Sequence, residues 1–190
     1  PVIGPLADQG IALEHLSMVT TTWAEWLRRH PDTTVLSLNT GHRRDYGEGV
    51  AYQSYFAGDQ LMFNTPFEDN RLKNKQEVLA LIFPALPEEQ LAIDTQFLNK
   101  TPLYKDRIGQ QKLVVLTDTT GANRVYDPQE VNFVSYDRDS TVVDSLGNEW
   151  LVKEEKLVSA DQETSLPRLP QRRAFWFGWQ AAFPDTRLVY

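Results

Sequence analysis

Cysteine is absent from all 190 residues of this chain. Disulfide bridges, thiolate nucleophiles and cysteine-based zinc sites are therefore excluded. Long apolar runs are absent as well, because no stretch of the sequence approaches the roughly 18 consecutive apolar residues that a transmembrane helix needs. The opening "PVIGPLADQG" also lacks the basic segment and apolar run of a secretory signal peptide. We expect no membrane insertion within this chain.

Positive charge is in short supply. Lysine and arginine number 19 against 26 acidic residues, which gives a formal net charge of −7 and a pI of about 5.0. Nucleic-acid binding needs clustered basic residues that neutralise phosphates, so this balance argues against a nucleic-acid partner. Hydrophobic residues make up 41% of the chain and aromatic residues 11%. This content predicts a folded core within one large domain or two small ones.

Motifs of known chemistry are scarce too. The sequence contains neither a Gly-x-Ser-x-Gly elbow nor a glycine loop that could cradle a phosphate. The histidines His15, His30 and His42 stand at no metal-ligand spacing. The stretch from Asp137 to Glu149 begins with two aspartates at the spacing of a calcium loop, but its later positions carry the wrong residues, so a hairpin is favoured. We predict no catalytic residue, no metal site and no cofactor.

What the sequence does contain is a repeated pattern near its two ends. "TTTWAEWLRRHPDTTVL" spans residues 20–36, here called the first Trp segment, and "RAFWFGWQAAFPDTRLV" spans residues 173–189, the second Trp segment. With an offset of 153 and no gap, ten of the thirty residues in 7–36 are identical to those in 160–189. Two tryptophans and the triplet Pro-Asp-Thr are among the identities. The pattern predicts an internal duplication.

Each Trp segment predicts a short helix that a proline ends. In the first, Thr22 and Glu25 have the spacing of a capping box, while Trp23 and Trp26 share one helical face. The residues "TVLSL" at 34–38 then predict a strand. The tryptophans could form a platform on which a sugar or a base stacks, or they could anchor a core. The continuous apolar face favours core anchors.

The rest of the sequence predicts mostly strands. "EVLALIF" at residues 77–83 predicts a buried strand, and residues 88–100 predict a strand through Ile93 followed by a helical turn. Residues 112–153 predict a meander of antiparallel hairpins with tight turns. The predicted fold class is therefore α+β and mainly β, with antiparallel strands and two short Trp-rich amphipathic helices.

These stretches resemble a known family. "PVIGPLA", "TTTWAEWLRRHPDTTVLSLNTGHRRDY" and "FWFGWQAAFPDTRLVY" are similar to the bacterial family of unknown function numbered DUF3179. The resemblance implies a tandem duplication, with this chain as the C-terminal portion of a longer protein. Residues 1–40 would end a first repeat, and residues 41–190 would form a second repeat that packs with 1–40 as one compact unit. The resemblance also implies a periplasmic, cell-envelope or secreted location.

The best candidate site is the stretch "GHRRDYG" at residues 41–47, together with two tyrosines that follow it. Its chemistry-bearing side chains are His42, Arg43, Arg44, Asp45, Tyr46, Tyr52 and Tyr55. Guanidinium groups bind carboxylate or phosphate bidentately, and an imidazole can move protons. No nucleophile with a general base accompanies them, so recognition of an anionic small molecule is favoured over catalysis. The alternative is a loop held by an internal Arg–Asp pair and tyrosine packing.

We interpret the chain as a non-catalytic ligand- or partner-binding module of an exported bacterial protein. Its expected partner is an anionic small molecule or the missing N-terminal repeat. Two alternatives stay open. The chain could be part of an enzyme whose active site the missing repeat completes, or it could be a purely structural repeat.

Overall fold

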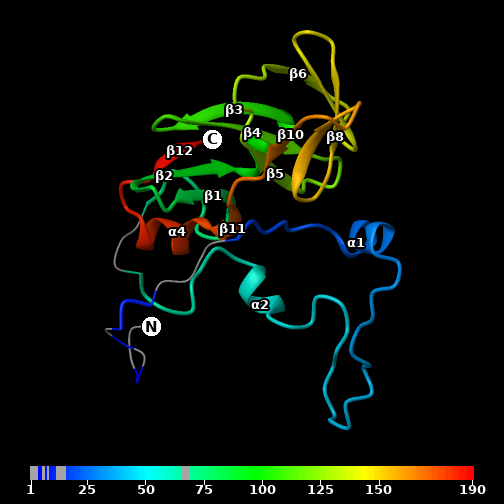
Figure 1. Cartoon of the computed structure of the whole chain (residues 1–190). Helices are drawn as coiled ribbons and strands as arrows, with labels where there is room; N and C mark the ends of the chain where they lie inside the picture. The colour runs from blue at the N-terminus through cyan, green and yellow to red at the C-terminus, as the bar shows by residue number, and fades with distance from the viewer. Residues whose placement is uncertain (1–3, 6, 8, 12–15, 66–68) are drawn as a thin grey trace.

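The computed structural model describes residues 4–5, 7, 9–11, 16–65 and 69–190. The helices of the N-terminal part are α1 (Trp23–Arg29) and α2 (Gln53–Phe56), and irregular chain joins them. Figure 1 shows both helices and their connecting chain beside a stack of sheets that the rest of the chain forms. In the part of the chain that the structure describes, no helix has the length and apolar character that crossing a membrane requires.

The first sheet has four strands in the order β11-β1-β2-β12. Its strands are β1 (Glu77–Phe83), β2 (Leu86–Asp94), β11 (Arg172–Phe175) and β12 (Arg187–Val189). β1 pairs antiparallel with both β2 and β11, whereas β12 pairs parallel with β2. Two helices flank this sheet in sequence, α3 (Thr95–Lys100) after β2 and α4 (Trp176–Ala182) between β11 and β12. The C-terminal strands therefore form both edges of the sheet.

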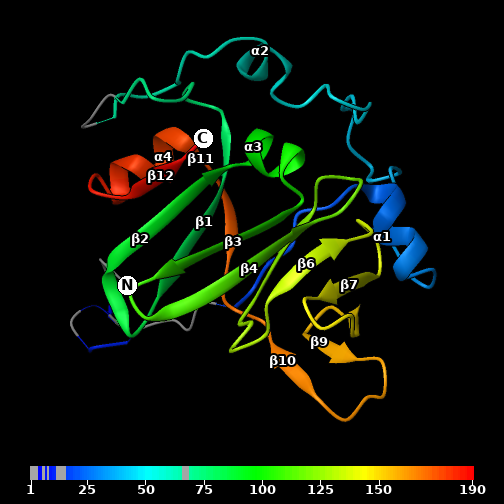
Figure 2. The same cartoon turned by 90° about the horizontal axis from the view of Figure 1, so that it is seen from above.

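The remaining strands form two antiparallel sheets. The three-stranded sheet, in the order β3-β4-β5, contains β3 (Leu103–Ile108), β4 (Gln111–Thr117) and β5 (Asn123–Tyr126). The five-stranded sheet has the order β10-β9-β8-β7-β6. Its strands are β6 (Phe133–Tyr136), β7 (Thr141–Asp144), β8 (Glu149–Val152), β9 (Lys156–Ser159) and β10 (Ser165–Pro167). Neighbours in sequence are neighbours in space, as the predicted meander requires, and Figure 2 shows these hairpins from above.

Strand alternation explains how the layers pack. Successive side chains of a strand point to opposite faces of the sheet. In β1, Leu79 and Leu81 face the core shared with the three-stranded sheet, whereas Val78 and Ala80 pack against α4. All four are at most 1% exposed. The residues of β1 are apolar on both faces of the sheet because other elements cover both faces.

The same alternation in β4 connects the other two sheets. Val115 belongs to the core shared with the four-stranded sheet, while Val114 and Leu116 pack in the core shared with the five-stranded sheet. In that second core the rings of Phe133 and Trp150 meet edge to face, with their centroids 5.8 Å apart. The layers therefore follow one another as α4, four-stranded sheet, three-stranded sheet and five-stranded sheet.

The structure confirms the predicted fold class and corrects two details of the first Trp segment. Residues 34–38 form no strand, and Leu36 is 95% exposed because no neighbouring strand covers it in the described chain. The core role predicted for the tryptophans holds for the second segment, where Trp176 is fully buried. It is wrong for the first segment, where Trp23 and Trp26 are 52% and 41% exposed. The predicted domain division at residue 40 stays a prediction.

Candidate anion-binding site

The site predicted from sequence lies on the exposed chain between α1 and α2 (Figure 1). Local hydrogen bonds shape it. The hydroxyl groups of Tyr46 and Thr40 lie 2.8 Å apart, and the Asp45 carboxylate accepts the backbone N–H of Gly47 at 2.8 Å. His42 is exposed and its carbonyl accepts the backbone N–H two residues on at 3.2 Å. These contacts hold the turn and leave the imidazole at the surface.

The remaining predicted residues are not gathered around one point. Within the described residues, neither Arg43 nor Arg44 takes part in an ion pair. Tyr52 is 67% exposed and precedes α2 in a left-handed conformation with φ of 59°. Tyr55 lies within α2, where the ammonium group of Lys75 sits 3.7 Å from the centre of its ring. Ligand binding by these residues stays a prediction.

A different place in the fold gathers charged side chains around a cavity. A cavity of about 320 Å³ lies between the first Trp segment and the sheets; we call it the arginine cavity. Its lining residues are Ser17, Met18, Val19, Thr21, Trp26, Arg29, His30, Arg124, Glu154 and Arg168. The N-terminal part and the β-rich part of the chain both contribute to this wall. No sequence pattern reveals this cavity, because its lining residues are spread over most of the chain.

The charged part of the wall is a cluster of arginines around one carboxylate. Glu154 accepts a hydrogen bond at 2.8 Å from Arg124 and one at 3.1 Å from Arg29, both on Oε1. Arg168 approaches the other carboxylate oxygen at 3.4 Å and also donates to the backbone carbonyl of the same residue. Each guanidinium group carries five N–H donors, so one carboxylate cannot satisfy three of them.

A buried aspartate holds Arg124 in place. Arg124 lies on β5 and is 2% exposed, and its Nη1 donates to the Asp118 carboxylate at 3.0 Å. Asp118 is itself held in the turn from β4 to β5, where it accepts the backbone N–H groups of Thr120 and Ala122 at 2.9 and 3.0 Å. A rigid turn thus orients the guanidinium plane at the cavity wall. The sequence offers one signal, an arginine beside Val125 in the short strand "NRVY".

Burial and ion pairing set the charge state of the cluster. Burial alone would raise the pKa of Glu154, but the hydrogen bond and charge of Arg124, with the charges of Arg29 and Arg168, outweigh it and lower that pKa. Burial lowers the pKa of Arg168, and its neighbours only partly offset this effect. An arginine still keeps its proton at neutral pH. The cavity wall therefore carries three cations and one anion.

Unpartnered polar atoms concentrate at this cavity. Six buried side-chain nitrogen or oxygen atoms lack a hydrogen-bond partner in the described chain, and five of them belong to residues that line the cavity. The five are Ser17 Oγ, Thr21 Oγ1, Arg124 Nε, Arg168 Nε and Arg168 Nη2. A buried polar atom left without a partner costs about 1–3 kcal/mol. This concentration makes the arginine cavity the strongest candidate binding site in the described chain.

Part of the cavity lining is less polar. Met18, Val19 and Trp26 belong to its wall, and the ring of His30 lies against the Trp26 indole with centroids 4.2 Å apart. The lining thus combines an aromatic and aliphatic part with a charged part. Ligand sites combine these two features, an apolar wall for contact area and a few polar groups for orientation.

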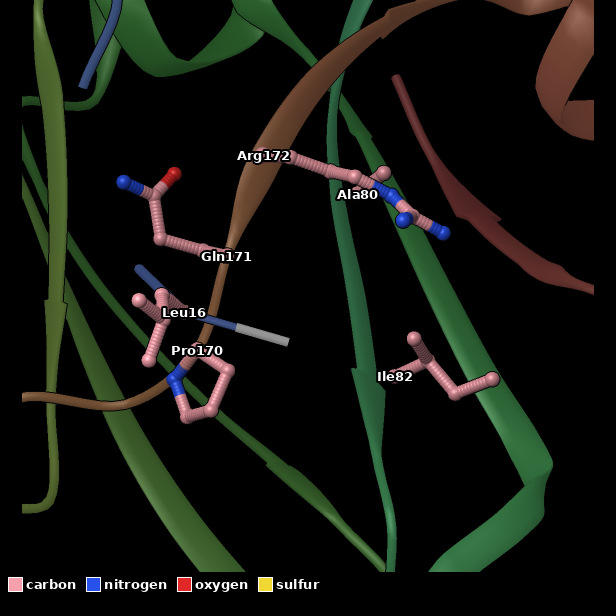
Figure 3. Close-up of a pocket in the computed structure, with 6 residues that line it drawn as sticks. All are labelled: Leu16, Ala80, Ile82, Pro170, Gln171 and Arg172. Atoms are coloured by element: carbon pink, nitrogen blue, oxygen red, sulfur yellow. The ribbon is translucent and has the colours of Figure 1, made fainter. Parts of the chain in front are cut away.

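A second hollow is much smaller than the arginine cavity and mostly apolar. Figure 3 shows it between β1 and β11, where Leu16, Ala80, Ile82 and Pro170 surround it. Its volume is about 20 Å³, which is room for about one water molecule. The side chains of Gln171 and Arg172 project to opposite sides of β11, as strand alternation requires. This hollow is too small for a metabolite.

Comparison with known proteins bears on the chain as a whole. A family model described as "Protein of unknown function (DUF3179)" matches residues 2–186. The chain belongs to the DUF3179 family. No curated protein and no solved structure matches this DUF3179 chain.

The described residues of this DUF3179 chain bear on two kinds of chemistry, metal binding and nucleophilic catalysis. Among them, no group of three or more histidine, aspartate or glutamate side chains is placed to hold a metal ion; His15 lies outside the described residues. Within the described residues the hydroxyl groups of Ser17 and Thr21 have no hydrogen-bond partner, so no described base is placed to activate them as nucleophiles. The described side chains of the cavity are thus mainly groups that can donate hydrogen bonds to an anion.

Proposed function

We propose that this chain is a non-catalytic module that binds a small organic anion in the arginine cavity. The observation that carries the proposal is the concentration of unpartnered polar atoms there, five of the six found in the described chain. Three of the five are guanidinium nitrogens, which only donate hydrogen bonds. Their missing partners must be acceptors, and an anionic oxygen is the acceptor that a guanidinium group binds most strongly.

The wall also defines the chemical class of the ligand. A carboxylate or phosphate group would accept from Arg124 and Arg168, and the hydroxyls of Ser17 and Thr21 would complete its shell. The body of the ligand would lie against Trp26, which favours an aromatic or aliphatic group over a sugar-like one. A volume of about 320 Å³ stands at the lower end of the range for ligand sites, so a small metabolite fits and a nucleotide cofactor does not.

Calorimetry with simple probes tests the proposal. Benzoate and phenyl phosphate combine an oxyanion with a flat apolar body, while acetate and inorganic phosphate offer the oxyanion alone. We expect the two aromatic probes to bind more tightly than their simpler counterparts. Substituting Arg168→Met should weaken binding of the aromatic probes by about tenfold or more, because it removes a charge-assisted hydrogen bond worth about 1.5–3 kcal/mol.

Arg138→Met is the matched control. Arg138 also carries a buried Nε without a partner, and its Nη2 donates to the Asp118 carbonyl at 3.2 Å, but the side chain does not line the cavity. This variant should bind the probes as the parent chain does. Equal affinity of the parent and Arg168→Met variants, or no binding of any probe, would sink the proposal.

The loop predicted from sequence offers a competing place for the anion. A double variant, Arg43→Ala with Arg44→Ala, removes both of its cations. If the arginine cavity is the site, this double variant keeps the affinity of the parent chain for phenyl phosphate. Loss of affinity there, with Arg168→Met unaffected, would assign binding to the loop instead.

The cellular setting is part of the same proposal. We infer export to the periplasm or cell envelope of a bacterium, supported by the resemblance of the sequence to the family. Fractionation of cells that produce the full-length protein tests it, and recovery in the cytoplasmic fraction would contradict it.

A further inference from the structure

The two Trp segments fold into the same local motif. α1 and α4 begin at equivalent tryptophans and each contains 7 residues. The indole of Trp26 donates to the Thr33 hydroxyl at 2.9 Å, and the indole of Trp179 donates to the Thr186 hydroxyl at 3.0 Å. The residues that end the two helices have nearly equal φ and ψ, −132° and 68° in one and −136° and 74° in the other. The segments differ in what covers them.

The second Trp segment shows which surface this motif fits. Trp176 and Trp179 are 0% and 3% exposed, and they pack on Val78, Ala80 and Ala92 of the β1–β2 hairpin. The small side chains of the hairpin leave room for the two large indoles. The strands that flank α4 complete the fit, since β11 pairs with β1 and β12 pairs with β2. A β-hairpin with small apolar side chains is therefore the natural cover of the motif.

In the first Trp segment a different face of the helix packs on the sheets. The face of α1 that meets the sheets is charged, because Glu25 is 9% exposed and accepts hydrogen bonds from Arg28 at 2.8 Å and Arg29 at 2.5 Å. The two arginines in turn each reach a carboxylate of the β-rich part at 3.1 Å. Trp23 is left outward and is 52% exposed, while Trp26 is 41% exposed and borders the arginine cavity. Figure 1 shows α1 well apart from the sheet that covers α4.

The sequence of α4 agrees with this difference. At the positions equivalent to Glu25 and Arg29, α4 carries Gly178 and Ala182, and both are exposed to solvent. The face that is charged and inward in α1 is thus small and outward in α4. The charged face of α1 and the tryptophan face of α4 are thus the ones that pack on the sheets.

The segments before the two helices meet at equivalent positions. Met18 donates its backbone N–H to the carbonyl of Gln171 at 2.9 Å, and the Gln171 side chain donates to the carbonyl of Met18 at 2.5 Å. These two residues are 153 positions apart, which is the offset of the sequence match. Contact between equivalent residues is the mark of a two-fold arrangement. A local two-fold would place a counterpart of the β1–β2 hairpin over the tryptophans of α1.

We propose that the tryptophan face of α1 is a docking surface for a β-hairpin with small apolar side chains, held as β1–β2 holds α4. Residues 19–22 and 34–36 correspond to β11 and β12 at the same offset, and within the described chain they pair with no strand. They would add the edge strands on either side of the docked hairpin. Val35 and Leu36, which are 69% and 95% exposed, would be covered in the process.

A peptide copy of the β1–β2 hairpin is the probe. A cyclised peptide with the sequence of residues 77–94 should bind the full chain and shift tryptophan emission to shorter wavelength as the exposed indoles become buried. A matched peptide with arginine in place of Ala80 and Ala92 should not bind. In the protein, Trp23→Ser should raise the Kd of the peptide by about tenfold or more, as expected for a central aromatic anchor.

Trp23 serves this test because it does not line the arginine cavity. Phenyl phosphate binding should therefore be equal in the parent and the Trp23→Ser variant, which separates the two proposals. Failure of the peptide to bind, or equal binding of its arginine version, would overturn the docking proposal. So would a dimer of the chain, seen by analytical ultracentrifugation and lost in Trp23→Ser, because a second copy would then be the occupant.

Discussion

The hydroxyl of Thr21 offers a test in which stability and binding change in opposite directions. Its Oγ1 is buried beside the arginine cavity and lacks a partner in the described chain. Thr21→Val keeps the shape of the side chain and removes the polar atom. Because an unpartnered buried polar atom costs about 1–3 kcal/mol, the free energy of unfolding should rise by about 1 kcal/mol or more in the absence of ligand. The melting temperature should rise by about 2–4 °C for a chain of this size.

The same change of threonine to valine in the second Trp segment should act oppositely. Thr186 is 3% exposed, and its Oγ1 accepts the indole N–H of Trp179 at 3.0 Å. Thr186→Val leaves that buried N–H without a partner, so the free energy of unfolding should fall by about 1–3 kcal/mol. Urea unfolding followed by circular dichroism measures the free energy of unfolding of both variants. Calorimetry with phenyl phosphate should show about three- to tenfold weaker binding for Thr21→Val and unchanged binding for Thr186→Val. If Thr21→Val destabilises the chain as Thr186→Val does, the reasoning about unpartnered atoms is refuted.

The remaining predictions concern packing and titration. Trp176→Ala should lower the free energy of unfolding by about 3–5 kcal/mol because the ring is fully buried. Trp23→Ala should change it by less than about 1 kcal/mol because that ring is exposed. Equal effects of the two substitutions in urea unfolding would contradict this difference in burial. The hydrogen bond from Arg28, helped by Arg29 and opposed by burial, lowers the pKa of Glu25 to about 2. A glutamate in an unfolded chain has a pKa of about 4.3. The stabilisation that the lowered pKa of Glu25 contributes to the folded state is therefore present above that pH and is lost as the pH falls toward 2. The slope of stability against pH in this window should flatten in Glu25→Gln, and an unchanged slope would argue against the ion pairs. Burial, with a hydrogen bond donated to a neighbouring aspartate, raises the pKa of Tyr104 to about 12; its phenolate absorbance should be missing from the wild-type minus Tyr104→Phe difference spectrum at pH 11.

Much of the fold was predictable because local signals agreed with the tertiary structure. Apolar runs gave β1 and β4, and Asp137 caps the turn between β6 and β7 by accepting three backbone N–H groups, as the preference for a hairpin over a calcium loop required. The cap of α1 was also visible, since Thr22 accepts the backbone N–H of Glu25 at 3.2 Å. Its expected reciprocal partner, the Glu25 side chain, is instead taken by two arginines.

The failures have a common physical cause. Periodicity says that a helix has an apolar face, and it cannot say which face the rest of the chain covers. Trp23 and Trp176 occupy equivalent positions of the repeated pattern. One is exposed and the other buried because, within the described residues, a hairpin covers α4 but not α1. The arginine cavity was unpredictable for a related reason. Arg29, Arg124 and Arg168 are far apart in sequence and meet through sheet topology alone.

The edges of the four-stranded sheet have a consequence for how the chain folds. β1 contacts β11 across a sequence separation of about a hundred residues, since Glu77 pairs with Phe175. Contacts of such long range slow folding, because the intervening chain must be ordered first. During synthesis the β1–β2 hairpin leaves the ribosome well before residues 172–189, so its edges and its Val78–Ala80 face stay open until the C-terminal segment arrives. This interval is when the nascent chain is most prone to wrong strand pairing, and chaperone contact would protect it there.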